Sequence, residues 1–259
     1  MRSSVISGIG VRQVGEGPPL VLIPGLAGLA SFWDGVANEL AGIYHVISLD
    51  HPGMGNSQPV TAHSIEAVVS GVVRVLDDMK VPRCAVVGHS TGGLVAQSIA
   101  LDFPSRLTKI VLSSTWAAPD QRFRDLFQLR QFVLDHAGHA AYARLGQLLA
   151  HPSEWYEKYL STESCAPLET GSDPRTDVIG QRIQMLLSYQ RIDELASIKL
   201  PTMVLGALDD NIVPFNHSLD LARRIPGAKL SELAGGHFTP TTRTADYARV
   251  VATFAGASV

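Results

Sequence analysis

The sequence predicts an α/β protein in which helices cover both faces of a parallel sheet. Short, β-branched apolar runs alternate along the chain with segments that have a 3.6-residue apolar period. The runs are apolar on both sides of the pleat, which is typical of strands covered on both faces. The chain has 259 residues, 46% of them hydrophobic, so it can bury a large core.

The strand and helix patterns follow one another in a regular order. Runs at 21–23, 45–50, 84–90 and 107–114 predict four strands, and 201–208 and 229–233 predict two more. The periodic segments predict helices over 64–79, 91–103, 215–224 and 244–255. This alternation of strand and helix predicts parallel pairing of the strands.

The segment 116–189 differs from the rest because it has helical patterns only. It predicts one or two helices over 121–150 and further helices over 151–160 and 178–190, with a loop at 169–177. We therefore expect a core domain of residues 1–115 and 190–259. Residues 116–189, called the cap below, are expected to form a lid over one edge of the sheet.

Composition excludes several classes of protein. The net charge is −3 and no block of like charge occurs, which argues against a nucleic-acid binder. The first 17 residues lack the apolar segment of a signal peptide, and no stretch approaches the roughly 18 apolar residues of a membrane span. Cys84 and Cys165 cannot form a disulfide framework. We expect a cytoplasmic protein that acts on a small molecule, with no membrane partner.

A serine lies at a sharp turn between a predicted strand and a predicted helix. The segment from Gly88 to Gly93 reads GHSTGG and matches G-x-S-x-G, with Ser90 in the middle. Small residues on either side let the strand and helix pass closely, and the helix N-terminus favours developing negative charge. The pattern predicts that Ser90 is a nucleophile.

A serine nucleophile needs a general base, and His237 is the candidate among nine histidines. It follows Gly235 and Gly236 on the loop after the last predicted strand, where the backbone can turn toward the sheet edge. His89 is interpreted as a pocket wall or core residue. His136 and His139 lie three apart on a helix, but no third ligand is evident, so no metal site is expected.

The base needs an acid, and two adjacent aspartates are candidates. Asp209 and Asp210 follow the strand at 201–208, and neighbours on an extended segment point opposite ways, so the position alone leaves both open. An oxyanion hole needs two backbone donors. The N–H of Thr91 is one, and the loop after the strand at 21–23 predicts Leu26 as the other.

The motifs PLVLIPGLAG, SLDHPGMGNS, VVGHSTGG, VLGALDDNIVP and GGH together resemble the α/β-hydrolase fold superfamily from about Val11 to Phe254. The resemblance implies a mostly parallel eight-stranded sheet, a helical cap and no cofactor. Its spacing favours Asp210 through Pro201 and Pro214, whereas one glycine favours Asp209.

Shorter motifs, LSSTW, HPSEW and DDNIVP, are similar to the aminoacrylate/carbamate hydrolases and, nearby, the 3-oxoadipate enol-lactonases. Many relatives have histidine where this chain has Pro24, so the surroundings of the oxyanion loop differ. The resemblance implies a serine hydrolase or esterase that cleaves a small ester, lactone or amide-like bond.

The cap is expected to set specificity, with Trp116 and Trp155 among its pocket candidates and His89 beside them. Most cap aromatics are interpreted as the cap's own core. Arg122, Arg124, Arg130 and Arg144 are interpreted as solvated, although one that reached the pocket would indicate an acidic substrate. A C–C hydrolase or lyase and a ligand sensor stay open as alternatives, as does a homodimer.

Overall fold

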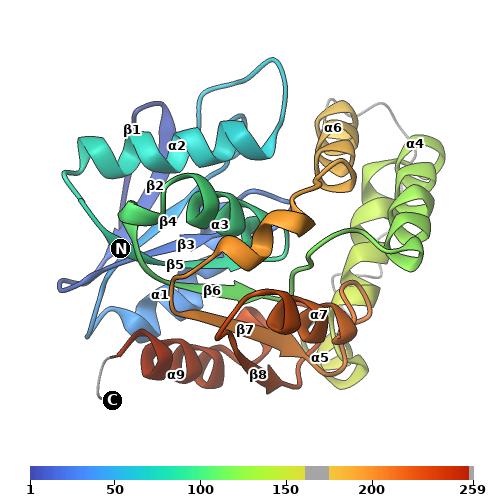
Figure 1. Ribbon diagram of the computed structural model, residues 1–259. Coiled ribbons are helices and arrows are strands. Elements are labelled where there is room, and N and C mark those ends of the chain that lie inside the picture. Colours follow the sequence, from blue (N-terminus) through green and yellow to red (C-terminus); the bar gives the residue numbers. More distant parts are fainter. Residues whose placement is uncertain (161–174, 257–259) are drawn as a thin grey trace.

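A computed structural model describes residues 1–160 and 175–256 as a sheet with helices on both faces (Figure 1). Within these residues one eight-stranded sheet has the order β1-β2-β4-β3-β5-β6-β7-β8. The strands are β1 (Arg2–Ile6), β2 (Ile9–Val14), β3 (Pro19–Ile23), β4 (His45–Leu49), β5 (Cys84–His89), β6 (Leu107–Ser113), β7 (Thr202–Ala207) and β8 (Lys229–Leu233). Strand β2 pairs antiparallel with both β1 and β4. All neighbouring strands from β4 through β3 and β5 to β8 pair in parallel. The predicted eight-stranded, mostly parallel sheet with helices on both faces is confirmed.

Alternate residues of the central strands enter two separate apolar clusters. Leu20 and Leu22 of β3 pack with helices α1 and α9, whereas Val21 and Ile23 pack with α2 and α3 on the other face. The helices of the core are α1 (Asp34–Leu40), α2 (Ile65–Asp78), α3 (Thr91–Asp102), α7 (Asn216–Arg224), α8 (Thr239–Thr242) and α9 (Thr244–Ala255). Short 3₁₀ turns are η1 (Ala30–Trp33), η2 (Pro104–Arg106) and η4 (Ile192–Ser197).

Three helices between β6 and β7 lie together at one side of the sheet (Figure 1). They are α4 (Gln121–Ala150), α5 (Ser153–Tyr159) and α6 (Arg175–Leu187). Gly138 has φ 80° and ψ 178°, so α4 consists of two helical arms joined at this residue, in line with the one or two helices expected. The loop expected at 169–177 is wrong at its end, because 175–177 begin α6; its earlier part and Cys165 lie outside the described residues.

The hairpin of β1 and β2 was not predicted from the sequence. Ser7 and Gly8 connect the strands, and both have positive φ, as a two-residue hairpin turn requires. The strand β1 is mostly exposed at the sheet edge, so its sequence RSSVI lacks the apolar run by which the inner strands were found. The Ser-Gly pair between Ile6 and Ile9 was the available signal.

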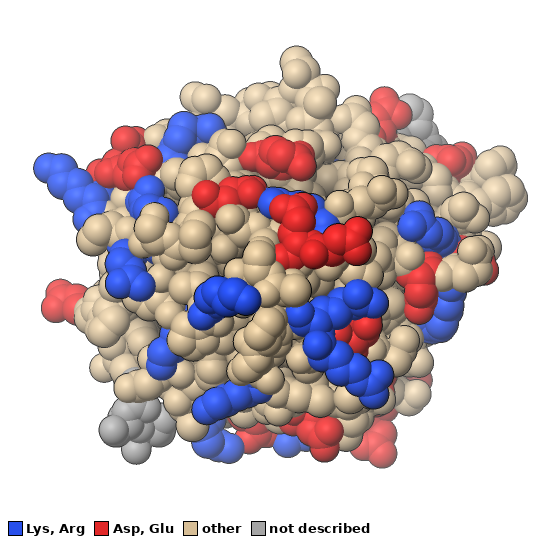
Figure 2. Space-filling model, in the orientation of Figure 1, with Lys and Arg blue, Asp and Glu red and all other residues tan. Residues whose placement is uncertain are grey.

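Positive and negative side chains are interspersed on the face shown in Figure 2, with no field of a single sign. None of the helices in the described ranges is both long and apolar enough to cross a membrane.

Candidate active site

Ser90 lies at the junction of β5 and α3 in a strained backbone conformation. Its φ of 54° and ψ of −121° are unusual for a residue with a side chain, and such strain costs about 1–3 kcal/mol. The surrounding glycines explain how the turn is accommodated. A Cβ at Gly88 would lie 2.2 Å from the carbonyl oxygen of Gly92, and one at Gly92 would lie 2.3 Å from that of Ile23. The glycines therefore let α3 approach both β5 and β3, which holds the Ser90 side chain at the end of the sheet.

His237 joins Ser90 to Asp210 in a continuous hydrogen-bond chain. Its Nε2 lies 3.1 Å from Ser90 Oγ, and its Nδ1 lies 2.7 Å from Asp210 Oδ2. A carboxylate accepts hydrogen bonds, so Nδ1 carries the proton and Nε2 is free to accept from the serine hydroxyl. All three side chains are buried, which strengthens these bonds relative to water. The structure thus brings together three side chains from distant segments that were predicted from the sequence.

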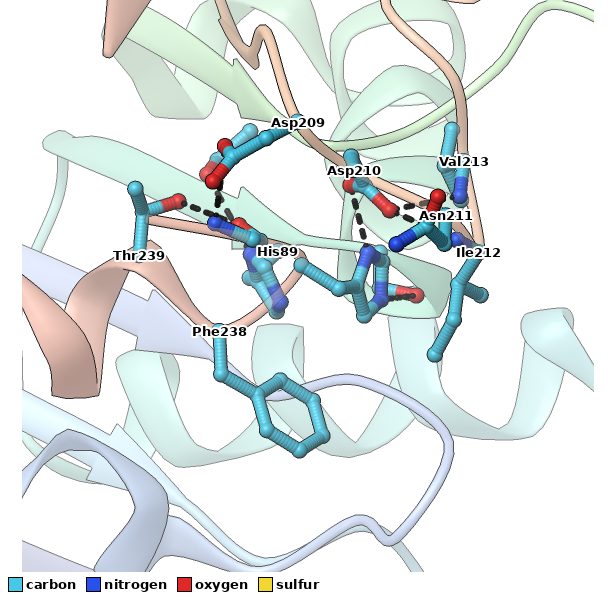
Figure 3. Close-up of polar contacts among 12 residues, drawn as sticks. His89, Asp209, Asp210, Asn211, Ile212, Val213, Phe238 and Thr239 are labelled. Carbon is cyan, nitrogen blue, oxygen red and sulfur yellow. Dashed lines mark hydrogen bonds and ion pairs between the residues drawn. The ribbon is translucent and has the colours of Figure 1, made fainter. Parts of the chain in front are cut away.

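Asp210 and its neighbour Asp209 turn to different sides, and each has its own partners (Figure 3). The second oxygen of Asp210, Oδ1, accepts from the backbone N–H groups of Ile212 and Val213, both at 2.8 Å. These bonds fix the carboxylate toward His237. Asp210 is therefore the aspartate in contact with the imidazole.

Asp209 instead holds the loop that carries His237. Its Oδ1 accepts from the N–H of Gly235 at 2.8 Å and from that of Gly236 at 2.9 Å. Gly236 has φ 70°, and a Cβ there would lie 2.4 Å from the carbonyl oxygen of Ala150. The two adjacent aspartates thus have different contacts: Asp210 contacts the imidazole, and Asp209 fixes the backbone beside it.

The loop after β3 passes directly beside Ser90. A Cβ at Gly25 would lie 3.6 Å from Ser90 Oγ, so the next residue, Leu26, begins its backbone close to the hydroxyl. Thr91 is the first residue of α3, where backbone N–H groups have no partner within the helix. The Leu26 and Thr91 N–H groups thus belong to segments next to Ser90, and their role as oxyanion donors stays a prediction.

The three predicted substrate-binding side chains lie at different depths. His89 is buried between Phe32, at 5.1 Å between ring centroids, and His237, at 4.9 Å. Burial, and then the charge that His237 can carry, hold the pKa of His89 well below its usual range, so it supports the His237 ring as a neutral group. Trp116 is buried after β6. Trp155 of α5 is half-buried and stacks on His151 at 4.4 Å.

Arg182 of α6 reaches the oxyanion loop, and sequence reasoning missed it. Its Nε donates to the Leu26 carbonyl at 2.7 Å, and a terminal nitrogen donates to His51 Nδ1, also at 2.7 Å. Burial mainly, and then the nearby positive charge of Arg182, holds the pKa of His51 well below its usual range. The imidazole is therefore a neutral acceptor. Its burial could have been suspected from the sequence, because the charged Arg182 lies on the apolar side of α6, beside Ile179 and Ile183.

Residues 1–160 and 175–256 contain no group of three or more histidine, cysteine, aspartate or glutamate side chains arranged to hold a metal ion. His136 stacks on Phe132, with ring centroids 4.1 Å apart, and Cys84 is a buried free thiol.

Comparison with protein families matches residues 18–243 to the family described as the alpha/beta hydrolase fold. Among curated proteins, the "Putative carbamate hydrolase RutD" of Caulobacter sp. (strain K31) is 32% identical over 261 residues, which cover 97% of each chain. The protein of the same name from Pseudomonas syringae pv. syringae is 32% identical and covers 93% of this chain and 95% of its own.

Solved structures show the same fold over nearly the whole chain. The enol-lactonase from Burkholderia xenovorans LB400 has a TM-score of 0.85 at 21% identity and covers 98% of this chain and 99% of its own. A thermophilic esterase from Thermogutta terrifontis has a TM-score of 0.83 at 20% identity, with 98% of each chain covered. These likenesses agree with the carbamate-hydrolase and enol-lactonase resemblance drawn from the sequence.

Proposed function

The chain belongs to the α/β-hydrolase fold family and is a hydrolase, and on that premise we propose that it is a serine hydrolase with a Ser90–His237–Asp210 triad. The observation that carries this proposal is the buried hydrogen-bond chain from the Ser90 hydroxyl through both nitrogens of His237 to the Asp210 carboxylate. A serine hydroxyl is a weak nucleophile by itself, and an adjacent oriented imidazole is what activates it.

In the proposed reaction, His237 takes the proton of Ser90 as Oγ attacks the substrate carbonyl. Asp210 keeps the imidazole in the reactive tautomer and stabilises its positive charge. The N–H groups of Leu26 and Thr91 bind the oxyanion, and His237 then passes the proton to the leaving group. Water, activated by the same histidine, hydrolyses the acyl-enzyme and restores Ser90.

The bond cleaved is proposed to be a small ester, lactone or carbamate-like bond. Support comes from the curated relatives named as carbamate hydrolases and from the fold shared with an enol-lactonase and an esterase. The cap is proposed to select among such substrates, because α6 contacts the oxyanion loop through Arg182.

Steady-state hydrolysis of p-nitrophenyl acetate and butyrate tests the triad. Ser90→Ala is expected to lower kcat by at least about a thousandfold, because the nucleophile and its partners act as a unit. The matched control is Ser98→Ala in the same helix, whose hydroxyl contacts Tyr189 Oη at 3.2 Å and not the site. This control should stay within about threefold of the wild type. Equal turnover by Ser90→Ala and wild type would overturn the proposal.

A further inference from the structure

The end of the cap helix α4 contacts the loop that carries His237. The N–H of Phe238, the residue after His237, donates to the carbonyl of Ala150 at 3.3 Å. A Cβ at Gly236 would lie 2.4 Å from the same carbonyl oxygen and 3.1 Å from Pro152 Cδ. The end of α4 and the turn into α5 therefore lie directly against the residues on both sides of His237.

The side chain of His151 continues this contact. Its ring centroid lies 5.2 Å from that of Phe238, and the two rings are nearly perpendicular, at 77°. The same ring is stacked on Trp155 of α5, at 4.4 Å and 8°. Its Nδ1 lies 3.0 Å from the Gln147 carbonyl, which can only accept, so Nδ1 carries the proton and the ring orientation is fixed. His151 is therefore a half-buried ring that the cap holds against the neighbour of His237.

Four aromatic rings, one of them the His237 imidazole, form a closed set of contacts. The centroid distances are 5.5 Å for His237–Phe238, 5.6 Å for Phe238–Phe32, 5.1 Å for Phe32–His89 and 4.9 Å for His89–His237. The Phe238 ring points away from Asp210 (Figure 3). Asp210 therefore fixes one nitrogen of the imidazole from one side, and the packed rings restrict its tilt from the other.

His151 contributes a neutral ring to this arrangement. Burial is the main cause that lowers the pKa of His151; the hydrogen bond to the Gln147 carbonyl opposes this shift, and the charge that His237 can carry lowers the pKa further. The ring is therefore uncharged at neutral pH. It can pack near His237 without repelling the positive charge that forms there in the proposed reaction.

A second histidine of α4 has the same local contacts but a different position. His136 Nδ1 lies 2.9 Å from the carbonyl of Phe132, four residues earlier, and its ring stacks on Phe132 at 4.1 Å and 20°. Both contacts lie within α4, and His136 is exposed. His151 differs in that its ring also contacts Phe238, so His136 is a matched control for it.

Burial within the cap does not by itself produce such a link to the core. Arg130 is only 8% exposed, so the expectation that it is solvated is wrong. Its guanidinium carbon lies 5.0 Å from the Phe127 ring centroid and 4.5 Å from that of Tyr142. Both rings belong to α4, one before and one after the bend at Gly138, so these contacts stay within the helix.

We propose that His151 is a positioning residue that keeps His237 aligned with Ser90 through its contact with Phe238. The inference rests on the proposed hydrolase function and adds a cap residue to the groups that orient the base. Misplacement of a reacting group by about 1 Å can cost about a hundredfold in rate, so a contact with the adjacent residue is sufficient to matter. Because His151 acts through His237 and not on the substrate, its loss should affect different esters alike.

Kinetics on p-nitrophenyl acetate and butyrate test the proposal. His151→Ala should lower kcat about tenfold or more on both esters and should change KM by less than about threefold. His151→Phe keeps a ring between Trp155 and Phe238 and should retain kcat within about threefold of the wild type. His136→Ala should leave both constants unchanged, because its contacts lie within α4.

Three kinetic results would overturn the proposal. One is an unchanged kcat in folded His151→Ala. Another is a loss that appears mainly in KM or differs between the two esters, because His151 would then contact the substrate. The third is a loss in His151→Phe as large as that in His151→Ala. If His151→Ala does not fold, His151→Leu, which fills the space without a planar ring, takes its place with the same expected result.

Proton NMR of the substrate-free protein keeps this inference apart from the proposed function, because it needs no turnover. The proton of His237 Nδ1 lies in the hydrogen bond to Asp210 and should give a low-field resonance that is absent from Asp210→Asn. His151→Ala should broaden or remove this resonance, and His136→Ala should not. A resonance that is identical in wild type and His151→Ala overturns the positioning role. A response to His151 together with full turnover by Ser90→Ala would overturn the triad reaction alone.

Discussion

Buried charged groups have different partners at the sheet edge and in the cap helices. At the sheet edge, Asp210 accepts from one imidazole and two backbone N–H groups, and Asp50 accepts from Ala30 and Asn56 N–H at 2.7 and 2.9 Å. Between α4 and α6, Arg130 and Arg182 meet only uncharged partners among the described residues.

The two regions differ in which groups stabilise their buried charges. Hydrogen bonds within the protein already fix the geometry at the sheet edge, so the side chains of the proposed triad are held in place before substrate arrives. In the cap region, the described partners of the two buried guanidinium groups are uncharged. On this account the core determines the chemistry, and the cap determines which molecule receives it.

The largest expected effect separates the two adjacent aspartates at the sheet edge. Asp210→Asn should lower kcat by about 10³–10⁴, because an amide cannot hold the imidazole in the reactive tautomer. Asp209→Asn should cost less than about tenfold in kcat, because the Asp209 carboxylate accepts from the Gly235 and Gly236 N–H groups, whereas Asp210 contacts the imidazole. It should instead lower the melting temperature. Kinetics on p-nitrophenyl butyrate and a melting curve of each variant check this, and a larger kcat loss in Asp209→Asn would reverse the assignment.

A smaller effect is expected where the two regions touch, at Arg182. Arg182→Gln frees the Leu26 carbonyl and should let the proposed oxyanion donor, the Leu26 N–H, move. Because losing such a donor outright costs about 10²–10³, its displacement should lower kcat by about ten- to a hundredfold, with little change in KM for a neutral ester. The matched comparison is Arg130→Met, which should leave kcat on the same ester unchanged. An unaltered kcat in a folded Arg182→Gln protein would show that the cap does not position this loop.

The last expected effect is on stability rather than on rate, and it depends on pH. Burial holds the pKa values of His51 and His89 well below the usual value, so the unfolded chain binds protons that the folded chain does not as the pH falls below about 6.5. The free energy of unfolding should therefore decrease as the pH is lowered, with a slope approaching about 2.7 kcal/mol per pH unit for two histidines. Urea unfolding at pH 7.5, 6.5 and 5.5 measures the slope.

Arg182→Gln sharpens this test, because His51 loses a neighbouring positive charge and His89 does not. The slope should become shallower in this variant and stay unchanged in Arg130→Met. A free energy of unfolding that is constant or rises toward pH 5.5 would contradict the burial of these imidazoles as neutral groups.

Residues that obey one strong local pattern were predictable from the sequence. The strand β8 and the helix α9 occur at the expected residues, 229–233 and 244–255, because apolar periodicity and burial agree there. Ser90 and His237 were found because glycines mark the sharp turns beside them. The contact between Asp210 and His237 needed the positions of two distant loops, and the local pattern alone left Asp209 equally acceptable.

Residues whose surroundings come from distant segments were not predictable in the same way. Arg130 lies among apolar neighbours of its helix, but a long arginine side chain on such a face often extends to solvent. Only the packing of the second arm of α4 against the first encloses it. Arg182 likewise lies on the apolar side of α6, and its acceptors come from loops at residues 26 and 51.

Covalent labelling tests the central claim most directly. The wild-type protein is treated with a fluorophosphonate, and the adduct is located by intact mass and peptide mapping. The account predicts one adduct per chain on Ser90, none on Ser90→Ala, and strongly slowed labelling of His237→Ala, because the oriented imidazole activates the hydroxyl. An adduct on another residue, or equal labelling of wild type and Ser90→Ala, would contradict it.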